Sequence, residues 1–142
     1  MSQELSEQEL QRRSSLSKLR ELGIEPYPAA TFSVSHLAES VKADYIENNH
    51  VKMAGRMMSQ RIMGKASFAE LQDSSGRIQL YINRDELCPG EDKTLYNEVF
   101  KKLLDLGDFI GIEGTVFKTQ VGEISVNVTS LTILSKSLKP LP

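Results

Sequence analysis

The sequence has no tryptophan and one cysteine, Cys88, and only 6% of its 142 residues are aromatic. A single cysteine cannot form a disulfide within the chain, which indicates a reducing compartment. No stretch approaches the roughly 20 apolar residues that a membrane-spanning helix needs. The first residues are polar and charged, without the apolar run of a secretory signal. We therefore expect a soluble, cytoplasmic protein with no membrane partner.

Catalytic motifs are equally scarce. The two histidines, His36 and His50, are far apart in the sequence, and together with Cys88 they match no zinc-binding spacing. The chain contains no GxSxG elbow, P-loop or dinucleotide fingerprint. The residues therefore predict no catalysis by this chain and no metal or cofactor bound to it.

Positive charge is concentrated in one stretch, although the net charge is −2. Residues 50–84 hold six Lys and Arg against two Asp and Glu, whereas 1–49 hold five against eight and 85–142 hold six against nine. A local basic stretch is typical of a nucleic-acid surface. Random unevenness in a small protein explains the same counts equally well.

Alternating apolar residues predict five strands, at about 50–61, 67–72, 77–83, 110–116 and 124–134. Turn residues at 73–76 and 120–122 separate the second from the third strand and the fourth from the fifth. Helical spacing at 94–104 stands between the third and fourth strands. This order predicts a mainly β protein with the five-stranded Greek-key barrel of the OB-fold. Other small β-barrels fit the strand pattern alone.

Helices are expected before the barrel. Ser6 and Glu9 have the spacing of a capping box, and Gly23 followed by Pro26 is a stop signal, so a first helix precedes Gly23. Its few leucines and its mixed charges, including Arg12 and Arg13, favour a solvated or partner-packed helix over one that contacts RNA. A second short helix is expected over 35–45, with Leu37 and Val41 on one face. We divide the chain into a helical extension at 1–48, the OB-fold domain at 49–136 and the start of a linker at 137–142.

The outward face of the second and third strands carries the most informative residues. Alternation places Phe68 on this polar face beside Glu70, with Gln79 on the neighbouring strand. Oligonucleotides lie on this face of an OB-fold. An exposed ring gives a base a stacking surface, and a glutamine amide matches the edge of an unpaired base. Arg61 adds a guanidinium group near a bend at Gly64.

Four further residues, Arg56, Lys65, Arg77 and Tyr81, form a supporting basic and polar face. In an alternative interpretation, Phe68 covers a small apolar cluster under the N-terminal segment and its polar neighbours are ordinary surface. The aromatic ring, the amide and the local positive charge meet on one face, so the residues predict an OB-fold that binds single-stranded nucleic acid.

The run RMMSQRIMGKASF at 56–68 resembles bacterial-type class II lysyl-tRNA synthetases. The resemblance continues through LQD at 71–73, GRIQLY at 76–81, KLLDLGD at 102–108, GEISV at 122–126 and LSKSLKPLP at 134–142. Upstream, LRELGIEPYP at 19–28 also matches, whereas 85–93 is the least similar stretch.

The resemblance implies that the chain is the N-terminal anticodon-binding domain of an enzyme that joins lysine to tRNA-Lys through an ATP-derived lysyl-adenylate. It implies that Phe68 stacks on the central anticodon base, that Arg61 and Gln79 hydrogen-bond the edge of that base, and that Glu123 contacts a neighbouring base. ATP and Mg²⁺ would belong to a catalytic domain beyond residue 142. The full-length enzyme would be a homodimer, and this chain by itself monomeric and inactive.

Three other functions remain open. The anticodon domain of an aspartyl- or asparaginyl-tRNA synthetase shares the fold and an aromatic stacking residue. A sequence-tolerant single-strand-binding OB-fold would bind any pyrimidine-rich strand equally well. A structural adaptor would use the Phe68 face for protein contacts, with little response to salt.

Overall fold

The computed structural model describes residues 7–22 and 32–135. Ser6, the stop signal at 23–28 and the linker at 137–142 lie outside the described residues. The described elements are, in chain order, α1 (Glu7–Glu21), α2 (Ala38–Ala43), β1 (His50–Met63), β2 (Ala66–Gln72), β3 (Arg77–Asn83), α3 (Arg84–Leu87), the π-helix η2 (Leu95–Leu103), β4 (Phe109–Lys118) and β5 (Ile124–Ser135).

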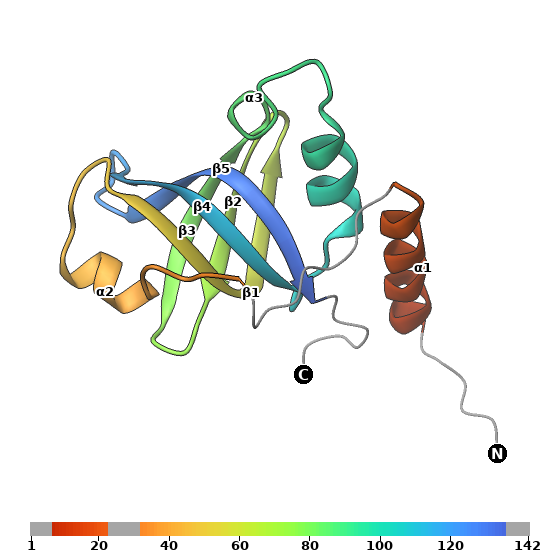
Figure 1. Cartoon of the computed structure of the whole chain (residues 1–142), viewed down its shortest axis with the longest axis horizontal. Coiled ribbons are helices and arrows are strands. Elements are labelled where there is room, and N and C mark those ends of the chain that lie inside the picture. The colour runs from red at the N-terminus through yellow and green to blue at the C-terminus, as the bar shows by residue number, and fades with distance from the viewer. Residues whose placement is uncertain (1–6, 23–31, 136–142) are drawn as a thin grey trace.

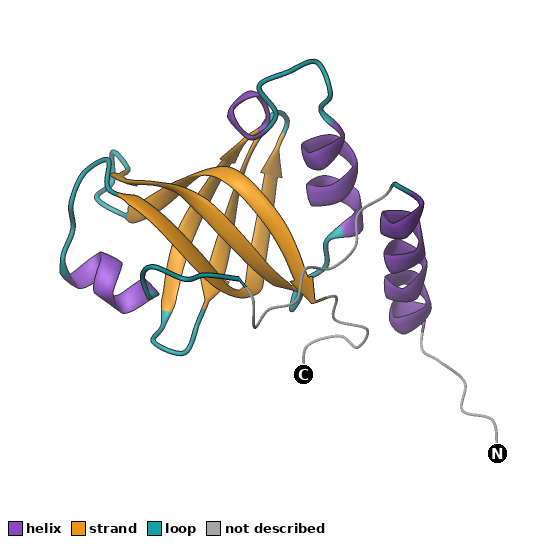
Figure 2. Ribbon diagram, in the orientation of Figure 1, coloured by secondary structure: helices purple, strands orange, loops and turns teal. Residues whose placement is uncertain are grey.

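The five strands form a closed barrel in the order β1-β2-β3-β5-β4 (Figure 1). Neighbouring strands are antiparallel except β3 and β5, which run parallel. Helices η2 and α1 stand side by side near one end of the barrel, and α2 lies near the other end (Figures 1 and 2). The predicted OB-fold, with helical structure between β3 and β4 and a helix at the N-terminus, is confirmed.

Strand β1 belongs to both halves of the barrel. Its first half, from His50 to Arg56, pairs with β4, and its second half, from Arg56 to Met63, pairs with β2. A β-bulge between Met57 and Ser59 shifts the register where the strand changes partner. Bulges increase the local bend of a strand, so this one helps β1 turn the corner of the barrel.

Alternate residues of each strand fill the barrel interior, as the sequence pattern predicts. The fully buried strand residues include Val51, Met53, Met57, Leu71, Ile78, Leu80, Ile82, Ile110, Ile112, Val126 and Val128. Strands approach closely at Gly114, where an added Cβ would lie 2.0 Å from the backbone oxygen of Asn127. Only glycine allows this approach of β4 to β5.

The segment between β3 and β4 differs from the single helix predicted at 94–104. The chain first forms α3, which begins directly after β3 ends. It then forms η2, which has the wide turn of a π-helix. The amide of Leu104 donates to the carbonyl of Val99, five residues back. This wider turn buries Tyr96, Val99, Phe100 and Leu103 together and leaves Leu95 at the margin of the core. The sequence pattern assumes the α-helical period of 3.6 residues and cannot show this.

The predicted helix at 35–45 is shorter than expected. Helix α2 begins at Ala38, and Leu37 before it is 44% exposed rather than buried beside Val41. The β2–β3 hairpin holds the start of this helix from outside. The Asp73 carboxylate accepts the Ala38 N–H at 2.7 Å, and the Ser75 hydroxyl accepts the Glu39 N–H at 3.0 Å. These partners replace the local cap that the sequence lacks.

Helix α1 packs against η2 through a narrow contact. Leu19 is fully buried, whereas Leu10 is 54% exposed and Leu22 is 41% exposed. Arg12 is buried and donates from Nη1 to the backbone oxygen of Leu106 at 3.0 Å. The predicted partner-packed helix therefore has part of its partner within this chain. None of the helices in the described ranges has the length and apolar character that a membrane crossing requires.

Candidate nucleic-acid interface

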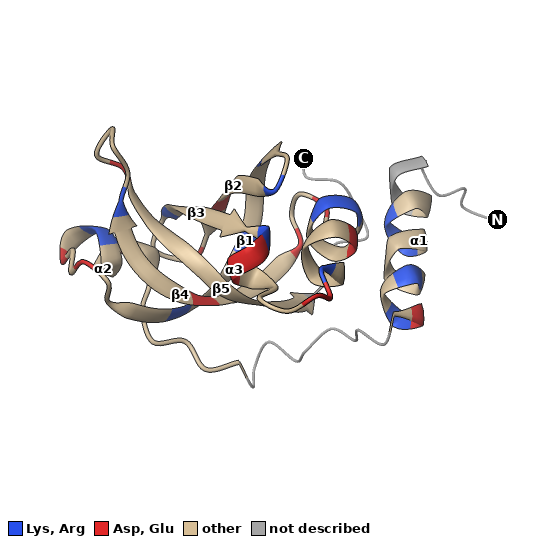
Figure 3. Ribbon diagram, turned by 90° about the horizontal axis from the view of Figure 1, so that it is seen from above, with Lys and Arg blue, Asp and Glu red and all other residues tan. Residues whose placement is uncertain are grey.

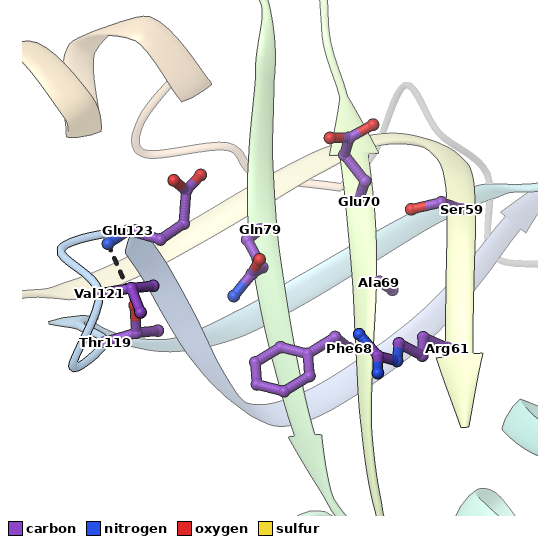
Figure 4. Close-up of a pocket in the computed structure, with 9 residues that line it drawn as sticks. All are labelled: Ser59, Arg61, Phe68, Ala69, Glu70, Gln79, Thr119, Val121 and Glu123. Atoms are coloured by element: carbon purple, nitrogen blue, oxygen red, sulfur yellow. Dashed lines mark hydrogen bonds between the residues drawn. The ribbon is translucent and has the colours of Figure 1, made fainter. Parts of the chain in front are cut away.

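A pocket of about 380 Å³ opens on the outer face of the barrel, between β1, β2, β3 and the β4–β5 turn (Figure 4). We call it the Phe68 pocket. Its lining residues are Ser59, Arg61, Phe68, Ala69, Glu70, Gln79, Thr119, Val121 and Glu123. Phe68, Arg61, Gln79 and Glu123, the four residues predicted to contact an anticodon, therefore come from four segments of the chain into one pocket.

Strand register explains why three of these side chains are neighbours. Arg61 on β1 lies opposite Phe68 on β2, and Glu70 on β2 lies opposite Gln79 on β3. The chain neighbours of Phe68 and Gln79 are buried in the core: Ser67, Ala69, Ile78 and Leu80. Because side chains alternate along a strand, the residues between them must point outward.

The ring of Phe68 is supported from one side before any ligand arrives. Tyr81, its cross-strand partner on β3, has its ring centroid 5.3 Å away at an interplanar angle of 55°. Tilted aromatic pairs at this separation attract one another. The contact limits the freedom of the Phe68 ring, whose remaining surface lines the pocket. In Figure 4 the side chains of Phe68 and Arg61 come from the neighbouring strands β2 and β1.

Two groups of different chemistry face Phe68 across the pocket. Gln79 donates from Nε2 to the Ser125 hydroxyl at 3.2 Å, which fixes the carboxamide while one N–H and the carbonyl oxygen are left for a ligand. Glu123 is exposed at the end of the β4–β5 turn. Thr119 holds this turn: its hydroxyl accepts the Glu123 N–H at 3.0 Å, and its own N–H donates to the Glu123 carbonyl at 2.9 Å.

The pocket combines one cation, Arg61, with the carboxylates Glu70 and Glu123. Glu70 is neutralised by an ion pair of 2.7 Å with Arg77. A phosphate group would meet the Glu123 carboxylate, whereas the edge of a base offers N–H donors to a carboxylate and acceptors to a guanidinium. The charges in the pocket therefore suit a nucleobase better than a phosphate.

The four supporting residues are placed less uniformly than the sequence predicts. Tyr81 supports Phe68 directly. Arg77 donates to Glu70 and Gln72 and does not line the pocket. Lys65, in the β1–β2 turn, and Arg56, at the far end of the β1–β2 ladder, are exposed outside it. Figure 3 shows Lys and Arg interspersed with Asp and Glu over the molecule rather than gathered on one surface.

Sequence reasoning missed Ser59, Thr119 and Val121 as pocket residues. Ser59 reaches the outer face because of the β1 bulge, which alternation alone does not locate. Val121 is 92% exposed at the tip of the β4–β5 turn. The sequence signal for Val121 was an apolar residue inside the predicted turn, between Gln120 and Gly122. Turns usually carry polar residues or glycine, so an apolar residue there indicates a contact with something outside the turn.

No group of three or more His, Cys, Asp or Glu within residues 7–22 and 32–135 has the arrangement of a metal site. The pocket thus offers stacking and hydrogen bonding through its own side chains. Stacking and hydrogen bonding by side chains are the means by which protein surfaces hold unpaired bases.

Comparison with known proteins agrees with this geometry. Residues 51–134 match the tRNA anticodon family, described as an OB-fold nucleic acid binding domain. The lysine–tRNA ligase of Christiangramia forsetii is 61% identical over 140 residues, covering 99% of this chain and 25% of that protein. The lysine–tRNA ligase of Porphyromonas gingivalis is 57% identical over 144 residues, covering 98% of this chain and 25% of that protein. The lysine–tRNA ligase of an Enterobacter species is 49% identical over 140 residues, covering 92% and 26%.

The chain thus spans about a quarter of the length of these relatives, 25% to 26% in each. The family match covers the whole barrel from β1 to β5, including every strand that lines the Phe68 pocket. By its fold, its pocket and this match, the chain belongs to the tRNA anticodon family of OB-fold nucleic acid binding domains.

Proposed function

We propose that this chain is the anticodon-binding domain of a lysine–tRNA ligase and that it reads the U-rich anticodon of tRNA-Lys. The observation that carries the proposal is the convergence of Phe68, Arg61, Gln79 and Glu123 on one pocket of the outer barrel face. The choice of lysine and of its tRNA rests on the names of the relatives, which are lysine–tRNA ligases.

Each side chain has a role that its chemistry supports. Phe68, backed by Tyr81, stacks on the central anticodon base. Arg61 and Gln79 hydrogen-bond the edge of that base, and uracil presents both the acceptors and the donor that a guanidinium and a carboxamide match. Glu123, held by the β4–β5 turn, accepts an N–H from a neighbouring base.

The activity of the whole ligase is part of the same proposal. The remaining three quarters of the relatives' length would hold the sites for ATP, Mg²⁺ and lysine and the homodimer contacts. Among the described residues there is no cluster of metal ligands, and no Lys or Arg other than Arg61 lines the Phe68 pocket. We propose the division into extension 1–48, barrel 49–136 and linker 137–142, and a cytoplasmic location.

A titration of the 142-residue chain with RNA hairpins tests the proposal. Fluorescence anisotropy is measured with a labelled hairpin whose loop contains UUU and with one whose central U is replaced by C. We expect the UUU loop to bind more tightly, because the groups around Phe68 match the edge of uracil. Equal binding of both loops, or of any pyrimidine-rich strand, would contradict anticodon reading and favour a sequence-tolerant single-strand binder. A central U does not separate lysine from aspartate or asparagine anticodons, so a third hairpin with GUC tests that alternative.

Phe68→Ala supplies the first prediction. Removal of the stacking surface should weaken UUU-loop binding by about 1–3 kcal/mol, with the thermal unfolding midpoint little changed because Phe68 lies outside the core. Leu106→Ala is the matched control, since it removes an apolar side chain that is 40% exposed outside the pocket. Unchanged RNA binding by Phe68→Ala would eliminate the stacking role.

A further inference from the structure

A second pocket lies on the outer barrel face, on the far side of Tyr81 from Phe68. It is open to solvent, has a volume of about 240 Å³ and is lined by Asn48, Tyr81, Glu86, Thr115, Phe117 and Asn127. We call it the Asn127 pocket. It shares no lining residue with the Phe68 pocket, and the proposed anticodon contacts leave it unused.

Aromatic rings connect the two pockets. Tyr81 contacts Phe68 on one side, with the ring centroids 5.3 Å apart, and Phe117 on the other, with the centroids 6.1 Å apart and the rings at 75°. Phe117 is partly exposed on β4, although an outward phenylalanine gains little from its position on the surface. The three rings form a continuous apolar path from the Phe68 pocket into the Asn127 pocket.

The strand register also connects the Phe68 pocket to the Asn127 pocket. Phe68 lies opposite Tyr81, Tyr81 opposite Asn127, and Asn127 opposite Thr115. All four point outward, because Leu80, Val126 and Val116 beside them are buried. Two strand spacings, about 10 Å, therefore separate Phe68 from Asn127, a span that neighbouring nucleotides of a splayed single strand can cover.

Asn127 contains an unused hydrogen-bonding atom. Its side-chain oxygen Oδ1 is buried and has no hydrogen-bond partner among the described residues. A buried polar atom without a partner costs stability, and the few that occur in folded proteins call for an explanation. Rotation of the carboxamide exchanges the positions of its oxygen and its NH₂ group, and in the rotated form the oxygen faces the pocket, where it can accept a hydrogen bond from a ligand.

The charge of the Asn127 pocket selects the part of a nucleotide that fits. No Lys or Arg lines it, and its one charged lining residue is the exposed carboxylate of Glu86. A phosphate would be repelled, whereas a base places its ring against Tyr81 and Phe117 and offers N–H donors to Glu86 and Asn127. Stacking on an aromatic side chain requires no particular base.

We propose that the Asn127 pocket receives a second unpaired base of the same RNA strand, one that flanks the anticodon in the loop. The base packs against Tyr81 and Phe117 and donates an N–H to the Asn127 side chain. This inference rests on the proposed function, since the Phe68 pocket must hold the anticodon for the flanking base to reach Asn127.

Abasic hairpins test this proposal with the 142-residue chain. The UUU hairpin is compared with two hairpins in which the loop nucleotide before or after UUU lacks its base. For the unaltered protein we expect one abasic hairpin to bind about 5- to 150-fold more weakly, as expected for one lost stacked base. In Phe117→Ala and in Asn127→Ala the UUU hairpin should bind more weakly, and the abasic penalty should fall to twofold or less. Leu106→Ala should retain the full penalty, and the unfolding midpoint of each variant confirms that it is folded.

The outcomes separate this inference from the anticodon assignment. A penalty below twofold for both abasic hairpins, or a penalty that persists in both pocket variants, overturns the second subsite while U-over-C preference keeps the anticodon assignment. Equal binding of the U- and C-centred loops, with the penalty present and lost in the variants, overturns anticodon reading and supports the subsite. Failure of every hairpin to bind overturns both.

Discussion

The carboxamide of Gln79 is held in one orientation, which suits its proposed role in discriminating between bases. Its Nε2 atom donates to the Ser125 hydroxyl, so the orientation of the carboxamide is fixed by β5 before a base enters the pocket. A fixed amide loses little freedom on binding and presents a defined donor and acceptor, which is the condition for discrimination rather than simple affinity.

Gln79→Ala should therefore reduce the preference for U over C at the centre of the loop more than it reduces affinity. We expect the U-to-C affinity ratio to fall toward one, a change of about 1–3 kcal/mol in discrimination. Anisotropy titrations with both hairpins measure the ratio, and Ser125→Ala provides an intermediate case because it releases the amide without removing it. An equal loss for both hairpins would contradict this role of Gln79.

At the residue scale, alternation alone predicted the outward positions of Phe68 and Gln79, and Arg61 was singled out by its place before the bend at Gly64. The presence of Glu123 in the same pocket was not accessible to this reasoning, because it depends on β5 pairing with β3, which brings the end of the β4–β5 turn to this face. Resemblance to a known family singled out Glu123, and Val121 beside it was missed by both approaches.

The pairing of β4 with β5 depends on glycine at position 114. A Cβ at Gly114 would lie 2.0 Å from the backbone oxygen and 2.8 Å from the backbone carbon of Asn127. Both are main-chain atoms of a paired strand, so neither can move without breaking the ladder.

Gly114→Ala should accordingly destabilise the protein by about 1–3 kcal/mol, the usual cost of overpacking. Thermal or urea unfolding measures the loss. Gly90→Ala is the matched control, because a Cβ there meets nothing within 4 Å. If both variants unfold at the same midpoint, β4 and β5 are farther apart at Gly114 than described.

The contact between α2 and the β2–β3 hairpin depends on the ionised form of Asp73. Burial pushes the pKa of Asp73 upward, but hydrogen bonds from the Ser75 hydroxyl and from the N–H groups of Ala38, Ser75 and Gly76 outweigh it and hold the pKa below 3.8. A carboxylate whose folded pKa is lowered stabilises the protein above its unfolded pKa of about 3.9. The stabilisation is lost as the pH falls through the lower, folded pKa.

Asp73→Ala should therefore cost about 1 kcal/mol near pH 7, as the loss of a helix cap does, and progressively less below about pH 4. Unfolding midpoints of the variant and the unaltered protein between pH 2.5 and 7 measure the difference. Glu47→Gln, which also removes one negative charge at an exposed turn residue, is the control. A constant difference across this range would contradict the role of the carboxylate.

At the element scale, strand positions followed from the sequence, whereas helices were less predictable. Two-residue periodicity depends only on which face is buried, and a closed barrel imposes it on every strand. The π-helical winding of η2 and the capping of α2 by Asp73 are tertiary effects. They arise from packing against the barrel and from a hairpin more than 30 residues away in sequence.

At the scale of the whole molecule, the net charge of −2 and the mixed surface shown in Figure 3 limit how strongly RNA is attracted through its phosphates. If the chain binds RNA as proposed, we expect the affinity to come mainly from stacking and base contacts, with a few cations such as Lys65 contributing. This balance would distinguish the protein from general nucleic-acid binders, whose affinity is dominated by phosphate contacts.

The logarithm of the hairpin association constant should fall with the logarithm of salt concentration by about 0.7 for each phosphate contacted, with few contacts in total. Lys65→Gln should lower this slope by about one contact while the U-to-C ratio is preserved. Titrations at several salt concentrations measure both quantities. A slope of zero would contradict phosphate contacts by this face.

The pairing of β1 with two different strands has a consequence for the order in which the chain is made. Its second half finds β2 a few residues later, but its first half must wait for β4, since His50 pairs with Thr115 and Arg56 with Phe109. During synthesis the β1–β3 meander therefore emerges with an open hydrogen-bonding edge. Contacts so distant in sequence form slowly, so the interval before β4 leaves the ribosome is when this barrel is most exposed to pairing with other chains.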